Sequence, residues 1–319
     1  GYAALEKVLS KADPEWIIEE IKASGLRGRG GAGFPTGKKW ELARACSDNH
    51  RPSYVVCNCD EGDPGAYMDR SLLEGNPHAI IEGMLIAGIA IGAAHGIIYV
   101  RSEYPLAIKH TLIALRQARE LGLVGADILG TGHDFEIEIV RGAGAFVCGE
   151  ETALIRSVEG FMGEPRQRPP YPIERGIDGC PTCINNVETL ANIRVIINRG
   201  AAEYAEVGVP GNTGTKIFSL VGKIRDTGLV EVPLGMTLGK VVHDIGGGPQ
   251  GKVSFQRQLH VSGCKRELLD VCFEVDDRLR RHIGSPIGIL KAVERLRLVW
   301  SGVVVIENPV KIIIVLWAP

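Results

Sequence analysis

The segment from Gly25 to Trp40 combines closely spaced glycines with cationic side chains, in the order GLRGRGGAGFPTGKKW. Glycines let backbone N–H groups close around an anion, and the N-terminus of the helix expected next, together with Lys39, adds positive charge. The run GRGGAG at 28–33 satisfies G-x-G-x-x-G, but it follows a predicted helix instead of a strand, which weakens a dinucleotide-fold interpretation. The segment predicts a phosphate site, and the alternative is a flexible connection.

A second segment, Cys57 to Arg70 (CNCDEGDPGAYMDR), follows an apolar run that predicts a buried strand. Ligands of open α/β sheets bind just past the carboxyl ends of the strands. Asn58 could hydrogen-bond the edge of a heteroaromatic ring, and the acids could bind ribose hydroxyls. Two alternatives stay open, which are a solvated acidic turn and a calcium loop, because carboxylates at alternate positions suit hard cations.

The third segment, Gly142 to Leu154 (GAGAFVCGEETAL), also lies between a predicted strand and a predicted helix. Its small residues permit close approach by a flat ligand, and Glu150 and Glu151 stand at the start of the helix. Capping is the alternative role for these two acids, because acidic side chains favour the first turn of a helix.

The elements that must position these segments alternate between strand and helix, which predicts an α/β fold. Asp13-Pro14-Glu15 is typical of the cap and first turn of a helix that runs to Ala23. From Lys216 onward, alternating apolar residues and a turn at 226–228 predict a β-hairpin, so we place a domain boundary near residue 210. The remaining expected elements are strands at 51–57, 97–100 and 135–140, helices at 77–93, 105–121 and 185–198, and an irregular loop at 160–182.

Composition excludes several classes of protein. The net charge of −2 provides no basic field for nucleic acid. The segment from Ile80 to Val100 is interrupted by Glu82, glycines and His95, so we expect no membrane insertion. The chain opens on Gly1 without a charged-then-apolar leader, and its eight cysteines are dispersed. We therefore expect a reducing, cytoplasmic location, either free or at the membrane periphery as part of a complex.

Taken together, the three segments resemble the NADH-binding flavoprotein subunit of respiratory complex I and its soluble relatives in NAD-linked hydrogenases and formate dehydrogenases. The resemblance runs over residues 2–256 and also includes EGNPH, the Arg-Pro-Pro loop and PTCINNVETLAN, all in the family's order. The form DEGDPG, with Asp63, is closer to the soluble hydrogenase and formate dehydrogenase branch.

The resemblance implies an FMN- and NADH-binding α/β domain over residues 1–210, followed over 211–256 by the start of a truncated β-grasp-like (soluble-ligand-binding) domain. It implies that FMN is held noncovalently by Gly28, Arg29, Gly30, Lys39, Asn58, Asp60, Gly149, Glu150, Ile184, Asn185 and Asn186. NADH would stack on the exposed flavin face, in contact with Gly31, Phe34, Lys39, Glu61, Asp63 and Glu151. Positioning and polarisation are then the protein's task, and no side chain acts as nucleophile or metal ligand.

Three positions depart from the commonest pattern of the family. Phe146 stands where a tyrosine is frequent, which removes one flavin-side hydrogen bond. Arg168 and Tyr171 replace a lysine and a phenylalanine, and they keep cationic and aromatic character.

The cysteines give no metal site by spacing. Cys180-Pro181-Thr182-Cys183 has redox or half-zinc spacing, but no second pair completes it. Cys57 and Cys148 are expected to be buried packing residues. Relatives carry Cys-x-x-Cys-x-x-Cys and a later cysteine as ligands of a [4Fe–4S] cluster, and that motif is absent here.

The last segment, residues 257–319, turns basic and loses the family pattern. Cys264 and Cys272 are too few and wrongly spaced to ligate a cluster. We hypothesise that the coding frame shifts near residue 256, and the alternative is a divergent domain with its own packing.

Two functions remain in competition. The first is an oxidoreductase in which NADH passes a hydride to flavin N5, followed by single-electron transfer to iron–sulfur protein subunits of a hydrogenase, a formate dehydrogenase or a complex I-like assembly. The alternative is a non-catalytic nucleotide- or flavin-binding assembly subunit.

Overall fold

The computed structural model describes residues 1–47, 51–250, 259–262, 302–306 and 312–316. The chain divides into two compact units. The first comprises residues 1–30, 34–62 and 69–205, and the second comprises 31–33, 63–68 and 206–319.

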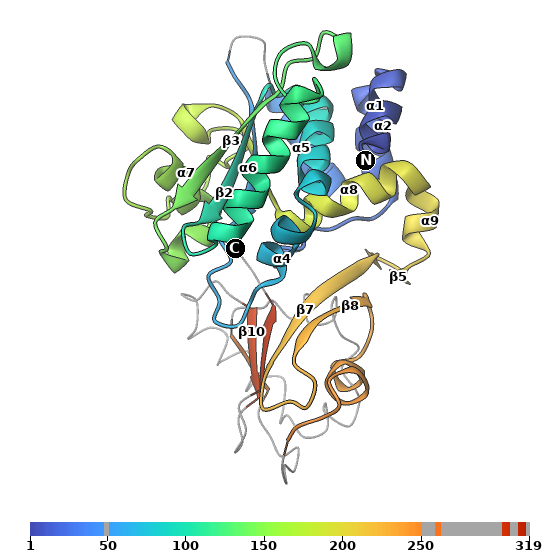
Figure 1. Cartoon of the computed structure of the whole chain (residues 1–319), viewed down its shortest axis with the longest axis vertical. Coiled ribbons are helices and arrows are strands. Elements are labelled where there is room, and N and C mark those ends of the chain that lie inside the picture. Colours follow the sequence, from blue (N-terminus) through green and yellow to red (C-terminus); the bar gives the residue numbers. More distant parts are fainter. Residues whose placement is uncertain (48–50, 251–258, 263–301, 307–311, 317–319) are drawn as a thin grey trace. The chain divides into compact units, whose positions relative to one another are not determined.

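A parallel sheet of four strands in the order β3-β2-β1-β4 forms the centre of the first unit (Figure 1). The strands are β1 (Tyr54–Cys59), β2 (His95–Arg101), β3 (Glu136–Gly142) and β4 (Thr182–Asn186). In the central register, Tyr54 on β1 faces His95 on β2 and Thr182 on β4. All four carboxyl ends therefore meet at one edge of the sheet, as the α/β prediction requires.

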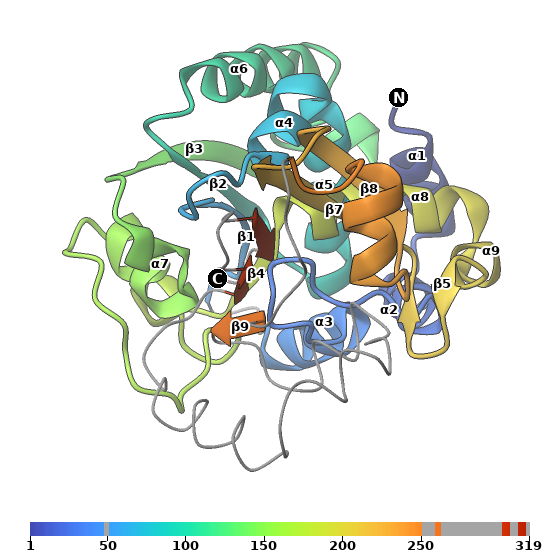
Figure 2. The ribbon, with the colours of Figure 1, turned by 90° about the horizontal axis from the view of Figure 1, so that it is seen from below.

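Alternate residues of the strands enter two different cores. Val55 and Cys57 of β1 and Ile98 of β2 pack against a large helical layer, whereas Val56 and Ile97 belong to a smaller cluster on the opposite face. Figure 2 shows α5 (Pro77–Ile91) and α8 (Val187–Arg199) on one side of the sheet and α7 (Glu151–Val158) on the other. This alternation is the period-2 geometry of strands that are buried on both faces.

The sequence predicted the main helices because their caps are local. Asp13 accepts a hydrogen bond from the N–H of Trp16 (3.1 Å) and opens α2 (Pro14–Ala23). Helix α5 begins after Asn76, which caps it, and ends at Gly92 with φ 78°. The other helices of four or more residues in the described part of the chain are α1 (Ala3–Lys11), α3 (Thr36–Cys46), α4 (Met68–Gly75), α6 (Pro105–Glu120), α9 (Ala201–Ala205), the 3₁₀ turn Phe146–Gly149 and the π-helix Lys240–Ile245. Among the described residues, no helix is long and apolar enough to cross a membrane.

Strand β4 was missed by the sequence prediction, which placed its first residue in a loop and its last two in a helix. The strand is only five residues long, and all five are buried beside β1. The strand ends in two asparagines, and asparagine is uncommon in strands. Local propensity therefore does not predict this strand, which forms because it packs beside β1. Helix α8 accordingly begins at Val187, two residues later than predicted.

The second unit contains the predicted hairpin, formed by β7 (Thr215–Gly222) and β8 (Gly228–Pro233) in antiparallel register. Strands β9 (Leu259–Ser262), β10 (Gly302–Ile306) and β11 (Ile312–Leu316) complete a sheet in the order β8-β7-β11-β10-β9. A short pair, β5 (Gly208–Val209) and β6 (Asn212–Thr213), stands apart. The β-grasp assignment and the frameshift stay predictions. Most of residues 257–319, including Cys264 and Cys272, lies outside the described residues.

Candidate functional site

The glycine-rich segment is a closed loop between α2 and α3. The N–H of Gly28 donates to the carbonyl oxygen of Phe34 (2.9 Å), and the N–H of Thr36 donates to that of Leu26 (2.9 Å). The N–H of Arg29 donates to Thr189 Oγ1 (2.8 Å), which ties the loop to the first turn of α8. The loop is thus anchored beside the carboxyl end of β4, as a phosphate loop requires and a flexible connection does not.

Arg29 is directed into the protein. Its guanidinium donates to the carbonyl oxygen of Arg27 (2.8 Å) and to Tyr204 Oη (3.3 Å), and the residue is 4% exposed. Phe34, by contrast, is 48% exposed, so its ring remains available to a ligand. Of these two residues predicted to contact a ligand, Phe34 is therefore exposed and Arg29 is buried.

Lys39, in the first turn of α3, joins the glycine-rich segment to two others that carry predicted ligand residues, the loop after β3 and strand β4. Its Nζ donates to Glu151 Oε1 (2.5 Å), after β3, and to the carbonyl oxygen of Ile184 (2.6 Å), on β4. Burial lowers the pKa of Lys39, but Glu151 outweighs it, so the pKa is raised and the ammonium stays charged. A second cation, Arg168, has its Nη1 3.7 Å from Glu151 Oε2.

The two acids at the start of α7 have different roles. Glu150 is the helix cap, because its Oε2 accepts from the N–H of Thr152 (2.9 Å) and of Ala153 (3.0 Å). Glu151 is half-buried and forms the ion pair with Lys39. Capping, which the sequence left open for both acids, describes Glu150.

The acidic segment begins with Asp60, the first residue after β1. Asn58 fixes it, since Asn58 Oδ1 accepts from the N–H of Asp60 (3.0 Å) and Asn58 Nδ2 donates to the carbonyl oxygen of Gly149 (3.0 Å). Burial raises the pKa of Asp60 to about 7, against the lowering effect of Arg101, and Glu103 adds to the rise. The carboxyl is therefore balanced between its two protonation states at neutral pH.

Glu61 caps a helix instead of facing solvent. Its carboxylate accepts from the N–H groups of Asp69 (3.1 Å) and Arg70 (3.2 Å) in the first turn of α4, and Tyr104 Oη donates to its carbonyl oxygen (3.0 Å). Gly31, with φ 111°, and Asp63 belong to the second compact unit, and Gly30 belongs to the first.

The two asparagines that end β4 are engaged by the protein. Trp40 Nε1 donates to Asn185 Oδ1 (3.0 Å). Asn186 Nδ2 donates to Asp69 Oδ2 (2.7 Å), and Asn186 Oδ1 accepts from the N–H of Glu188 (2.9 Å) as the cap of α8. These amides brace the loops around the site, and the direct contact with FMN that the resemblance implies for them stays a prediction.

Sequence reasoning missed several residues that hold the site together, among them Arg101, Thr189 and Asp69. Arg101 ends β2, and its Nη2 donates to Glu103 Oε1 (3.0 Å) and to the carbonyl oxygen of Gly144 (3.5 Å). The rule that ligands gather at the carboxyl ends of strands could have identified it, because the strand before it was predicted. Thr189 and Asp69 act through backbone and amide contacts that no motif reveals.

The loop at 160–182 packs against α7, where Thr152 Oγ1 accepts from the N–H of Arg166 (2.7 Å). A cavity of about 200 Å³ opens there, lined by Thr152, Ile155, Arg166, Gln167, Pro170, Pro172 and Arg175. The long irregular segment therefore helps to shape a concave surface, as is typical of functional loops.

The cysteines in the described part of the chain are free thiols. Burial raises the pKa of Cys57 and Cys59 well above the usual value, and raises that of Cys183 to about 11. Within the described ranges, no three His, Cys, Asp or Glu residues are grouped so that they could hold a metal ion.

Residues 21–195 match the family described as the Nuo51 FMN-binding domain. The chain is 54% identical over 253 residues to the NADP-reducing hydrogenase subunit HndC of Solidesulfovibrio fructosivorans, covering 79% of this chain and 51% of that one. It is 48% identical to the F subunit of the NADH-quinone oxidoreductase of Aquifex aeolicus (79% and 58% covered), and 46% identical to that of Rickettsia bellii (88% and 68% covered). The chain thus spans about half the length of the first of these relatives.

A similar solved structure is the crystal structure of an NAD+-reducing [NiFe]-hydrogenase in the H2-reduced state. It superposes with a TM-score of 0.73 at 41% identity, over 82% of this chain and 43% of that chain.

Proposed function

This chain belongs to the family of Nuo51 FMN-binding domains, and we propose that it binds FMN, accepts a hydride from NADH on the flavin and passes the electrons on singly. The observation that carries the proposal is the convergence on Lys39, which joins the glycine-rich segment, the loop after β3 and strand β4 through Glu151 and Ile184. Those three segments contain most of the residues predicted to contact FMN.

The residues present fit a flavin mononucleotide. Thr36 Oγ1, at the first residue of α3, is buried without a hydrogen-bond partner in the described part of the chain. A Cβ added at Gly149 would lie 3.3 Å from the carbonyl oxygen of Asp60, so a larger residue would crowd this loop. A cation, a free hydroxyl and a close backbone approach suit the phosphate, the ribityl chain and the flat ring of FMN.

In this proposal, the side chains and backbone of the protein hold FMN and orient NADH. The flavin, when bound, would accept the hydride from NADH and supply the one-electron chemistry. Gly28, Gly30 and Lys39 would hold the phosphate end, whereas Phe34 and Glu151 would position NADH. Because Glu151 is fixed by Lys39, its carboxylate is preorganised to accept hydrogen bonds from ribose hydroxyls.

Iron–sulfur protein subunits are the proposed acceptors, in a hydrogenase, a formate dehydrogenase or a complex I-like assembly. We propose a cytoplasmic location, free or at the membrane periphery within a complex. Residues 1–210 would form the FMN- and NADH-binding domain and residues 211–256 the start of a β-grasp-like domain.

Because the sequence after residue 256 lacks Cys-x-x-Cys-x-x-Cys, we expect the purified chain to contain FMN but no iron or acid-labile sulfide. About four irons per chain after anaerobic reconstitution, a full [4Fe–4S] complement, would overturn this expectation.

The test compares two adjacent lysines in the full-length chain. Lys39→Met should release FMN and abolish NADH:ferricyanide activity, because it removes the half-buried cation shared by three segments. Lys38→Met is the matched control, since Lys38 is exposed and pairs only with Glu41 among the described residues. Equal FMN content and activity in both variants would refute the proposed site. A parent protein that binds FMN but is not reduced by NADH would instead be a flavin-binding assembly subunit.

A further inference from the structure

Asp60 lies where two loops at the carboxyl edge of the sheet touch. A Cβ added at Gly149 would lie 3.7 Å from Asp60 Oδ2, so the carboxyl rests directly against the loop that precedes α7. Asn58 links the same two loops through the backbone of Asp60 and Gly149. Asp60 is 1% exposed. Because it is held on both sides, a change in its charge cannot be relieved by swinging the side chain into water.

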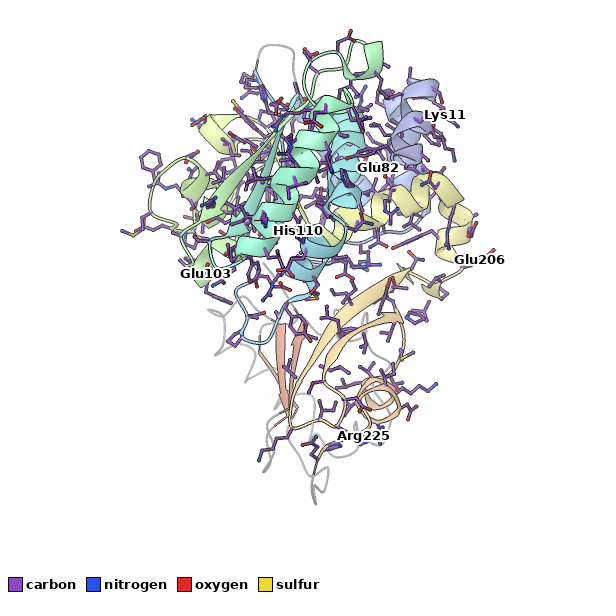
Figure 3. All side chains as sticks on the ribbon, in the orientation of Figure 1. Lys11, Glu82, Glu103, His110, Glu206 and Arg225 are labelled. Atoms are coloured by element: carbon purple, nitrogen blue, oxygen red, sulfur yellow. The ribbon has the colours of Figure 1, made fainter. Side chains whose placement is uncertain are left out.

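The charged and titratable groups around Asp60 come mainly from β2 and the residues after it. Arg101 favours the carboxylate and Glu103, which lies just past the end of β2 (Figure 3), favours the acid. Tyr99 and Cys59 also face Asp60, and both stay neutral at ordinary pH because burial raises their pKa values. Burial is the largest influence on Asp60 itself, and it raises the pKa of this carboxyl well above the ordinary value.

In the neighbouring loop, Glu150 already pairs with a cation, because Arg168 Nη2 lies 3.4 Å from Glu150 Oε1. Glu150 follows Gly149, but its carboxylate turns to the N-terminus of α7 and accepts from Thr152 and Ala153. Arg101 divides its guanidinium between Glu103 and the carbonyl oxygen of Gly144. A ligand that brings charge to this edge or excludes water from it would therefore shift the pKa of Asp60.

We propose that the Asp60 carboxyl takes up one proton from water when FMN binds, and that the loaded protein holds Asp60 as a neutral acid that donates a hydrogen bond. The inference rests on the proposed FMN site. FMN brings a phosphate that is largely doubly negative above a pH of roughly 6. A bound ligand also removes water from the carboxyl. Added negative charge and lost solvation both favour the neutral acid.

The pH dependence of FMN affinity follows from the pKa of Asp60 in the free protein and its higher pKa in the FMN-loaded protein. Asp60 has a pKa of about 7 before binding, and binding raises it. Well below both values the acid is present in both states and no proton is taken up. Between them, each FMN that binds takes up a proton, so FMN affinity falls by up to about tenfold per pH unit. The loss starts near neutral pH and ends above the pKa of the loaded state.

Isothermal titration calorimetry of FMN into the full-length apoprotein at a single, mildly alkaline pH measures this directly. Titrations in two buffers of different ionisation enthalpy give the protons taken up per FMN. The matched variant is Asp60→Asn, a neutral isostere that still donates a hydrogen bond. The parent should take up between about half a proton and one proton more than Asp60→Asn. Protons that belong to the FMN phosphate cancel in the difference.

A second variant changes the electrostatics without touching the carboxyl. Glu103→Gln removes the charge that favours the acid, so the pH at which FMN affinity begins to fall should move down. Equal proton uptake by parent and Asp60→Asn overturns the inference while FMN binding stands. An unchanged onset in Glu103→Gln also overturns it, even where Asp60→Asn fails to fold. Absence of FMN binding by the parent at every pH would refute the proposed function and this inference together.

Discussion

The two faces of the parallel sheet in the first unit are packed in different ways. On one face, α5 and its neighbouring helices cover a large apolar core that includes Leu85 and Ile98. On the other, a cluster around Val56 and Ile97 is covered by α7 and irregular loops. The segments with the predicted ligand residues follow the carboxyl ends of the strands. There, loops cover the sheet beside the smaller apolar cluster, and polar side chains are partly buried.

Buried acids show the same contrast. On the helical face, Glu82 Oε1 accepts from the N–H groups of Ala4 (2.9 Å) and Leu5 (3.1 Å), so this carboxylate caps the first turn of α1. At the carboxyl edge, Asp60 is held in an environment that favours its neutral form. The helical face is therefore organised for stability, whereas the edge holds a carboxyl whose ionised form is disfavoured.

The largest expected loss of stability comes from a substitution on the helical face of the sheet. Leu85→Ala removes a fully buried side chain of α5 and should lower the free energy of unfolding by about 2–5 kcal/mol, because it leaves a cavity. Urea denaturation measures the change. Leu112→Ala on α6, where the side chain is 49% exposed, should stay within about 0.5 kcal/mol of the parent. FMN affinity of folded Leu85→Ala should match the parent, and a large loss would break the division between the faces.

Replacing a buried acid by its amide should change the free energy of unfolding in opposite directions at the carboxyl edge and on the helical face. Asp60 has a folded pKa of about 7, above the unfolded value of roughly 3.9, so the parent loses stability as pH rises between these values. At pH 8, Asp60→Asn should therefore stabilise the apoprotein, by up to about 4 kcal/mol. Glu82→Gln should destabilise it by about 1 kcal/mol, because a charged cap becomes neutral. Thermal unfolding at pH 5 and pH 8 tests both, and a stabilising effect of equal size at both pH values for Asp60→Asn would contradict the account.

A smaller effect is expected at the end of β4. Asn186→Ala removes the cap of α8 and the hydrogen bond to Asp69, with a loss of about 1–3 kcal/mol. The loops it braces should loosen, so the variant should lose FMN on dilution. Equilibrium dialysis compares FMN retention, and Asn198→Ala, at an exposed position near the end of the same helix, is the control. Equal retention by Asn186→Ala and the parent would remove Asn186 from the site.

The smallest effect should appear in substrate binding alone. Glu151→Gln replaces a charge-assisted hydrogen bond to ribose with a neutral one, which should raise the KM for NADH about fivefold while FMN stays bound. Glu41→Gln is the control, because Glu41 forms ion pairs with Lys22 and Lys38 away from the loop before α7. An unchanged KM would leave Glu151 as a partner of Lys39 only.

Much of the first unit could be predicted from the sequence, because its signals are local. The cap at Asp13 and the apolar strands β1 and β2 follow from residue type and spacing. Strand β4 could not, since five residues that end in two asparagines have no strand pattern until β1 lies beside them.

The sequence predicted many of the residues that lie around the carboxyl edge of the sheet, but not the contacts that each of them makes there. Glu61, Glu150 and Asn186 are caps, and a cap is defined by which N–H groups lie nearby in space. Arg101 was missed because a single cation at a strand end is no motif, although it shapes the electrostatics of Asp60.

The central claim is that the carboxyl edge of the parallel sheet binds FMN where NADH can reduce it. Anaerobic titration of the FMN-loaded, full-length chain with NADH tests this most directly, with the visible flavin absorption followed after each addition. The account predicts that about one equivalent of NADH bleaches the band, since one hydride carries two electrons, and that Lys39→Met neither retains FMN nor shows bleaching. A flavin band that persists under excess NADH in the loaded parent would contradict it.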